Sequence, residues 1–78
     1  MIEMFLTWFE MPRVYEDMPM WGAIGKPFQY IMSYDPETLK FAVSAKYPNT
    51  SKRIDLGEYY SEKDATLACE THYSNNRQ

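Results

Sequence analysis

The sequence predicts an α+β domain in which an antiparallel β-meander of three or four strands is followed by one C-terminal helix packed on one face. Two observations carry this prediction. Residues 28–45 contain two segments of alternating apolar and polar side chains around a turn signal, which is the pattern of a β-hairpin. Residues 61–73 begin with a helix-capping signal and carry small side chains at helical spacing. At 78 residues, the chain fits a single small domain, 1–78.

The N-terminal segment, residues 1–27, is expected to be largely irregular and is rich in aromatic and methionine side chains. Residues 1–10 fit either a strand or a short helix, because apolar side chains recur at alternate positions and also at spacings of three and four. The strand is favoured, since Trp, Phe and Thr fit pleated surfaces. After a loop, residues 20–24 fit a second short strand that ends at Gly25.

The hairpin opens the meander predicted for residues 28–60. Strands are expected at 28–34 and 39–45, joined by the Asp-Pro-Glu-Thr turn at 35–38, where Asp suits the first turn position and Pro presets φ at the second. A four-residue loop predicts the register, and alternation places the apolar side chains on one face. The predicted facing pairs are Tyr34 with Leu39, Met32 with Phe41, Tyr30 with Val43, and Phe28 with Ala45.

The remaining elements are a third meander strand and the helix. The strand is expected at 53–60, where Gly57 marks a bulge or a close approach of the backbone. The helix is expected at 61–74, with Ser61 as its N-cap and Asp64 three residues further on. The stripe that would let this helix sit close to the sheet consists of Ala65, Ala68, Cys69 and His72.

The composition provides much packing material and few reactive groups. The chain has two tryptophans, seven tyrosines, four phenylalanines and six methionines, but one cysteine and one histidine. Its net charge is −3, and its basic residues are scattered along the sequence. This argues against direct nucleic-acid binding, because proteins that bind phosphates usually carry a basic stripe. We therefore expect a protein that acts by binding other proteins and carries no cofactor.

Cys69 and His72 are the one pair whose spacing suits nucleophilic chemistry, since they lie three residues apart on the predicted helix. Catalysis also needs an orienting third group and an oxyanion site, and the sequence pattern provides neither. A zinc site takes about four ligands, which one cysteine and one histidine cannot supply. We expect neither an enzyme nor a metal site.

Two features predict a cytoplasmic protein without a membrane segment. A lone cysteine supplies no internal disulfide. The apolar first ten residues include Glu3 and lack both a basic start and a small-residue cleavage site, which argues against a secretory signal. They are also too few to span a bilayer.

The order of the elements resembles that of many small phage and prophage proteins. These run from a Trp-bearing strand, through a second Trp and a short meander, into an Ala-rich helix. The matching pieces are Leu6-Thr7-Trp8, Trp21-Gly22-Ala23, Tyr30-Ile31, Leu56-Gly57-Glu58-Tyr59-Tyr60 and the helix at 61–73. The resemblance covers most of the chain, and it implies a phage accessory protein that works in the cytoplasm of a bacterial host.

Small acidic proteins of that origin, the anti-CRISPR proteins among them, often inhibit a host complex by binding it. The resemblance therefore implies that the partner is a host protein or ribonucleoprotein complex of antiviral defence. Two alternatives stay open. One is an accessory protein that binds single-stranded nucleic acid on a Tyr-rich sheet. The other is a homo-oligomeric structural or assembly factor.

The candidate partner-binding residues are aromatic, methionine, leucine and acidic side chains that the predicted core does not absorb. Trp, Tyr and Met are enriched in interface cores, and carboxylates complement a basic patch. The same apolar side chains would equally complete a thin core or form a homodimer contact. The candidates are Tyr15, Glu16, Asp17, Met18, Met20, Trp21, Tyr59, Glu62 and Leu67.

Overall fold

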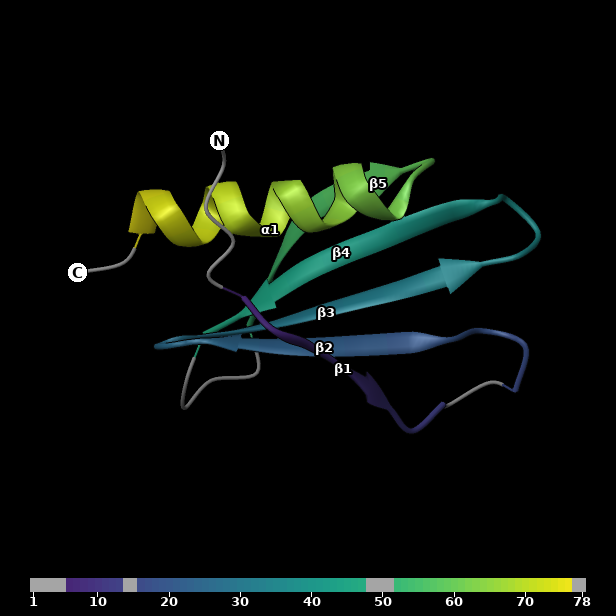
Figure 1. Cartoon of the computed structure of the whole chain (residues 1–78), viewed down its shortest axis with the longest axis horizontal. Coiled ribbons are helices and arrows are strands. Elements are labelled where there is room, and N and C mark those ends of the chain that lie inside the picture. Colours follow the sequence, from purple (N-terminus) through teal and green to yellow (C-terminus); the bar gives the residue numbers. More distant parts are fainter. Residues whose placement is uncertain (1–5, 14–15, 48–51, 77–78) are drawn as a thin grey trace.

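The computed structural model describes residues 6–13, 16–47 and 52–76. Within them lie a five-stranded antiparallel sheet and one helix (Figure 1). The α+β class and the C-terminal helix are confirmed, and the sheet has five strands where three or four were expected. The elements, with the strands lying in sequence order across the sheet, are β1 (Trp8–Met11), β2 (Met20–Gly25), β3 (Phe28–Asp35), β4 (Lys40–Lys46), β5 (Arg53–Tyr59) and α1 (Glu62–Asn76).

Both short strands expected in the N-terminal segment are present, and they belong to the same sheet as the meander. β1 pairs with β2 from Trp8↔Ala23 to Met11↔Met20, so the strand interpretation is confirmed over Trp8–Met11. Trp8 packs against the core cluster. Residues 1–5 lie outside the part of the chain that the structure describes.

The hairpin of β3 and β4 is present, but its predicted register is wrong by two residues. Met32 pairs with Val43 and not with Phe41, and the last pair is Asp35↔Lys40. The turn decides this. The Asp35 side chain accepts the N–H of Glu37 at 2.9 Å, and the N–H of Leu39 donates to the Asp35 carbonyl at 2.8 Å. Leu39 thus belongs to the turn, at φ 61° in the left-handed region.

The predicted irregularity at Gly57 is confirmed as a bulge in β5. The register against β4 shifts between Val43 and Ser44, and Gly57 has φ 108°, which side chains rarely adopt. Two local bonds hold the bulge. The Asp55 carboxylate accepts the N–H of Gly57 at 2.9 Å, and the Tyr59 hydroxyl donates to the Leu56 carbonyl at 2.7 Å.

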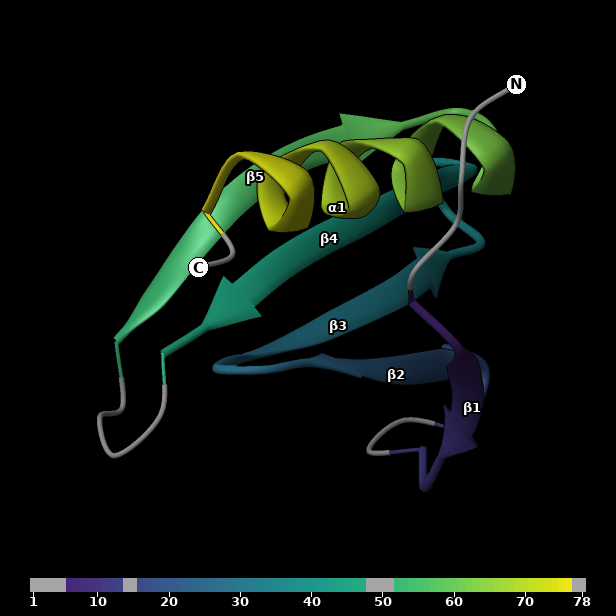
Figure 2. The same cartoon turned by 60° about the vertical axis from the view of Figure 1, so that its left-hand side comes forward.

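The helix α1 begins where the capping signal predicts and runs back along one face of the sheet over β3, β4 and β5 (Figures 1 and 2). The Ser61 hydroxyl accepts the N–H of Asp64 at 3.1 Å, as an N-cap does. From the predicted stripe, Ala65 and Cys69 are buried against the sheet. The rest of the core lies beneath them and consists of Leu6, Ala23, Phe28, Tyr30, Met32, Val43 and Ala45.

Candidate binding surface

The antiparallel topology sorts the charges of the chain to opposite ends of the sheet. The connection from β1 to β2, the turn from β3 to β4 and the junction of β5 with α1 all lie at one end (Figure 1). We call this the acidic end, because its described residues include seven carboxylates and only three cations, Arg13, Lys40 and Lys63. The carboxylates are Glu16, Asp17, Asp35, Glu37, Glu58, Glu62 and Asp64.

The opposite end of the sheet has the reverse charge. The turn between β2 and β3, the end of β4 and the start of β5 meet there. Four cations occupy the described residues of this basic end: Lys26, Lys46, Lys52 and Arg53. A molecule with this separation of charge presents opposite fields at its two ends, and such fields steer association with charged partners.

Two large apolar side chains are exposed at the acidic end. Leu39 in the β3–β4 turn is 59% exposed, and Tyr60 at the β5–α1 junction is 74% exposed. The two connections that carry them are neighbours, because Lys40, which follows Leu39, holds its Nζ 5.3 Å from the centroid of the Tyr60 ring. Apolar side chains of this size surrounded by carboxylates form the arrangement of a binding surface, with anchors inside a charged rim.

Four of the predicted partner-binding residues lie at the acidic end. Glu16 and Asp17 are exposed and Met18 is half-buried in the β1–β2 connection, while Glu62 is exposed at the start of α1. The connection and the helix start lie near opposite edges of the sheet, roughly 15–20 Å apart at about 4.8 Å per strand. The β3–β4 turn fills the space between them. Tyr15 lies outside the described residues.

The other predicted residues are distributed elsewhere. Trp21 faces the helix side and packs on the core, with its ring centroid 6.2 Å from that of Phe41. Its ring therefore contributes to the fold. Met20 is half-buried on the opposite face of β2, beside Met11 on β1.

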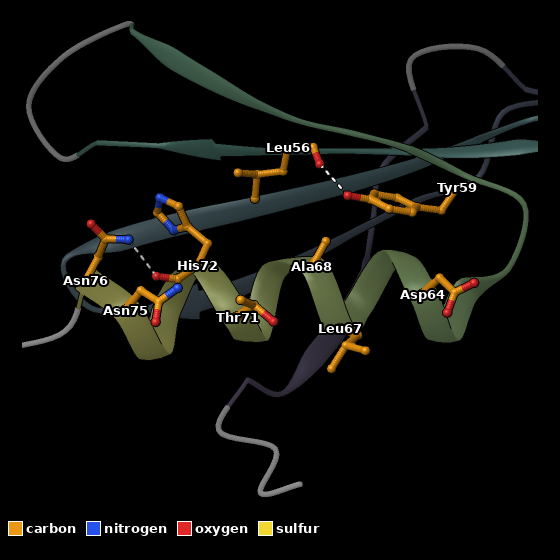
Figure 3. A pocket seen from close by; sticks show the side chains of 9 residues that line it. All are labelled: Leu56, Tyr59, Asp64, Leu67, Ala68, Thr71, His72, Asn75 and Asn76. Carbon is orange, nitrogen blue, oxygen red and sulfur yellow. Dashed lines mark hydrogen bonds between the residues drawn. The ribbon is translucent and has the colours of Figure 1, made fainter.

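Tyr59 and Leu67 come together in a groove between β5 and α1, which Figure 3 shows from close by. The groove has a volume of about 620 Å³. Leu56 and Ala68 contribute to its apolar lining, and His72 lies toward the C-terminal end of α1. Both predicted residues are half-buried there. The groove thus begins at the acidic end, where Asp64 also lines it, and continues along α1.

Sequence reasoning missed Leu39 and Tyr60 as surface anchors. Leu39 was assigned to the core face of the hairpin, because it continues the alternation of β4. Tyr60 was assigned to the end of a strand. A signal existed for Tyr60, since it immediately precedes the N-cap Ser61, and a residue before an N-cap lies in a connection. No sequence signal separates a Leu in the turn from a Leu at the first position of the strand.

The structure buries Cys69 in the core and leaves His72 half-buried at the groove between β5 and α1. Cys69 is fully buried. Burial is the larger cause, and the nearby Glu70 carboxylate the smaller one, of a rise in the pKa of its thiol to about 12. The thiol is therefore protonated at neutral pH, whereas a nucleophile needs the thiolate. Nδ1 of His72 lies 2.8 Å from the Tyr30 hydroxyl, and burial lowers the pKa of His72. A neutral imidazole accepts the hydroxyl proton of Tyr30 in this geometry.

The described residues contain neither a cluster of metal ligands nor a membrane-spanning helix. Over residues 6–13, 16–47 and 52–76, no three His, Cys, Asp or Glu side chains gather closely enough to hold a metal ion. In that same part of the chain, no helix has both the length and the apolar character needed to cross a bilayer.

Comparisons with known proteins identify no relative of this chain. No protein-family model matches the chain, and neither the curated proteins nor the solved structures include a significant match. The acidic end is therefore chosen as the candidate binding surface from its own residues. Leu39 and Tyr60 are exposed there, and carboxylates lie on the three connections that meet at this end.

Proposed function

We propose that this protein binds a basic surface of another macromolecule through its acidic end and inhibits that partner by occupying the surface. The observation that carries the proposal is the exposure of Leu39 and Tyr60 on neighbouring connections at the acidic end, among its carboxylates. The anchors would supply affinity on burial, and the carboxylates would supply orientation and association rate.

The backbone at Leu39 supports the proposal. A non-glycine residue in the left-handed region costs about 1–2 kcal/mol, and Leu39 has φ 61°. This cost is not offset by burial, because most of the side chain is exposed. Strained backbone of this kind is common at binding sites, where the strain positions a side chain for a partner.

The class of partner follows from the charge of the acidic end and from the phage resemblance. Carboxylates spaced along one end of the sheet imitate phosphates, so they suit a groove that normally holds nucleic acid. We propose a phage protein that acts in the bacterial cytoplasm on a host defence complex of CRISPR–Cas type. Such a complex is a ribonucleoprotein with a positively charged channel.

The test measures binding of the full chain to purified CRISPR–Cas effector complexes by a fluorescence titration. The double variant Leu39→Ser/Tyr60→Ser should weaken binding at least about a hundredfold, since each anchor is expected to contribute at least about tenfold. Glu37→Lys and Glu62→Lys should slow association and reduce its dependence on salt. Ile24→Ser is the matched control, because Ile24 is equally exposed at 57% but lies away from the acidic end.

Affinity that is unchanged in the Leu39→Ser/Tyr60→Ser variant would contradict the proposal. If Ile24→Ser alone lowers the affinity, the partner binds the face of the sheet opposite α1 and not the acidic end. If no effector complex binds, capture from host lysate followed by rebinding of the purified captured protein identifies another partner. That partner must show the same dependence on Leu39 and Tyr60.

A second candidate function, binding of single-stranded nucleic acid, is favoured by one observation. Tyr47 is exposed at the basic end, next to Lys46 on β4. The Tyr-rich face first considered for this role is covered, since Tyr30 is buried beneath α1. A titration with single-stranded oligonucleotides at low and moderate salt tests it. Affinity should fall steeply with salt and with Lys46→Glu if this function is correct.

A further inference from the structure

We infer that the face of the sheet opposite α1 is the contact between two copies of this chain in a homodimer. This goes beyond the proposed function and uses a different surface. No described helix or strand covers this face (Figure 2). Its half nearest β1 carries five apolar side chains, which we call the open-face patch: Phe9, Met11, Met20, Ile24 and Ile31.

The strand register brings the open-face patch together. Gly22 of β2 lies between Phe9 of β1 and Ile31 of β3. A Cβ at Gly22 would come within 2.7 Å of Met11 Sδ and 3.1 Å of the Phe9 ring, so both side chains lie over this glycine. Phe9 is still 49% exposed and Ile24 57% exposed. Contiguous exposed apolar side chains of this kind mark an interaction site.

The charges on the same face identify the occupant as a second copy. Lys46, Arg53 and Asp55 lie on its basic half and give it a net charge of +1. Asp35, Glu58 and Lys40 lie on its acidic half and give it a net charge of −1. A two-fold axis that runs across the strands would place the basic end of each copy over the acidic end of the other. It would also place the apolar half over itself, as an isologous interface requires. An axis along the strands would instead bring like charges together.

The size of the face sets the expected strength. Five strands about 4.8 Å apart and about seven residues long at 3.4 Å each give roughly 600 Å² for each copy. A standard interface buries about 800 Å² on each side, so this contact is at the lower limit of specific interfaces. We therefore expect a dimer that forms and dissociates in the micromolar range.

Sedimentation equilibrium of the full chain, from low to high micromolar concentration, tests the inference. A reversible monomer–dimer equilibrium is expected. Ile24→Ser should raise its dissociation constant at least about tenfold, because two isoleucine side chains leave the dimer interface. The matched control is Tyr47→Ser, which removes an exposed ring on the helix side of the sheet, where it lies 4.9 Å from the Phe28 ring, and should leave the equilibrium unchanged.

A charge exchange tests the orientation without changing the apolar side chains. Arg53→Glu and Glu58→Arg should each weaken the dimer, and the double variant should restore it, because the charges reverse while remaining complementary across the axis. A chain that is monomeric throughout, or a dimer insensitive to both Ile24→Ser and Arg53→Glu, overturns the inference. Partner binding is scored separately through Leu39 and Tyr60, so failure of one proposal is distinguishable from failure of the other.

Discussion

The backbone N–H of Leu6 donates a hydrogen bond of 2.9 Å to Oε2 of Glu70, although 64 residues separate them. Glu70 is only 3% exposed, so its carboxylate lies inside the core with Leu6. β2 passes close to the same point, since a Cβ at Gly25 would lie 2.6 Å from Leu6 and 2.8 Å from Tyr73. The contact joins the N-terminal segment, the sheet and α1.

Replacing Glu70 by alanine should destabilise the fold by about 1–3 kcal/mol, because the buried N–H of Leu6 loses its acceptor. Glu70→Gln should cost less, since its amide oxygen still accepts the bond. Urea unfolding followed by circular dichroism measures both. Glu62→Ala on the same helix is the control, and its exposed carboxylate should account for no more than about 1 kcal/mol. Equal effects of Glu70→Ala and Glu62→Ala would contradict this role.

Stability should depend on pH through His72. Burial lowers the pKa of His72 below its ordinary value of 6.5. Between 6.5 and the lowered value, the unfolded chain binds a proton that the folded chain does not. The contribution is therefore fully present above pH 6.5 and is lost as pH falls through this window. The slope should stay under about 1.4 kcal/mol per pH unit, the limit for one proton.

Urea titrations at several pH values measure this dependence, with His72→Gln as the comparison. Glutamine can still accept the Tyr30 hydroxyl but does not titrate. The ring neighbours of His72, Tyr30 and Phe28, do not titrate near pH 6 either. The variant should therefore lose the decrease that begins below pH 6.5. Parallel curves for the two proteins would show that His72 is not its source.

Cys69 should resist thiol reagents in the folded protein. It is fully buried and its pKa is raised to about 12. Little of the thiol is therefore ionised, and a reagent cannot reach its sulfur in the folded protein. At pH 8, labelling of the folded protein should be slower than labelling of the urea-unfolded protein by on the order of a thousandfold. A colorimetric disulfide reagent measures both rates. Rapid labelling without urea would mean that α1 opens from the sheet far more often than its packing indicates.

Gly57→Ala should destabilise the fold by about 1–2 kcal/mol, because a side chain is strained at positive φ. The new Cβ would also lie 3.0 Å from the Tyr59 hydroxyl oxygen, which holds the Leu56 carbonyl. Thermal unfolding measures the loss. Tyr59→Phe, which removes only that hydroxyl, provides the reference for the hydrogen bond alone. A neutral Gly57→Ala would show that the bulge relaxes to ordinary strand geometry.

Leu39→Gly should separate stability from binding. Relief of about 1–2 kcal/mol of left-handed strain outweighs the 0.5–1 kcal/mol entropic cost of glycine, so the variant should be as stable as the original chain or slightly more so. Its affinity for the partner should nevertheless fall, because an anchor is lost. Leu39→Ala keeps the strain and also loses the anchor, so it should be the less stable of the two. The reverse order of stability would mean that the Leu39 side chain stabilises the turn.

Local chemistry made several elements predictable from sequence. The alternation in 28–45 predicted two strands and the apolar face that lies under the helix. Ser61 and Asp64 predicted the helix start, because an N-cap is satisfied within one turn. Gly57 predicted the bulge. Each of these signals acts between residues that are close in sequence, so each could be interpreted without the fold.

The hairpin register shows where alternation fails. A shift of two residues leaves every side chain on the same face, so the apolar pattern is satisfied equally by Met32↔Phe41 and by the observed Met32↔Val43. Backbone bonds at Asp35 made the choice by taking Leu39 into the turn. The exposed position of Leu39, and with it half of the proposed anchor pair, follows from that choice.

By itself, the sequence determined the fold class, the place of the β3–β4 turn, the helix cap and the scarcity of reactive groups, because these depend on neighbouring residues and on composition. Only the tertiary structure decided which side chains are exposed and which charges are neighbours. Glu70 is buried where its oxygen accepts a backbone N–H that lies far away in sequence. The carboxylates gather at the acidic end because, in an antiparallel meander, alternate connections lie at the same end of the strands.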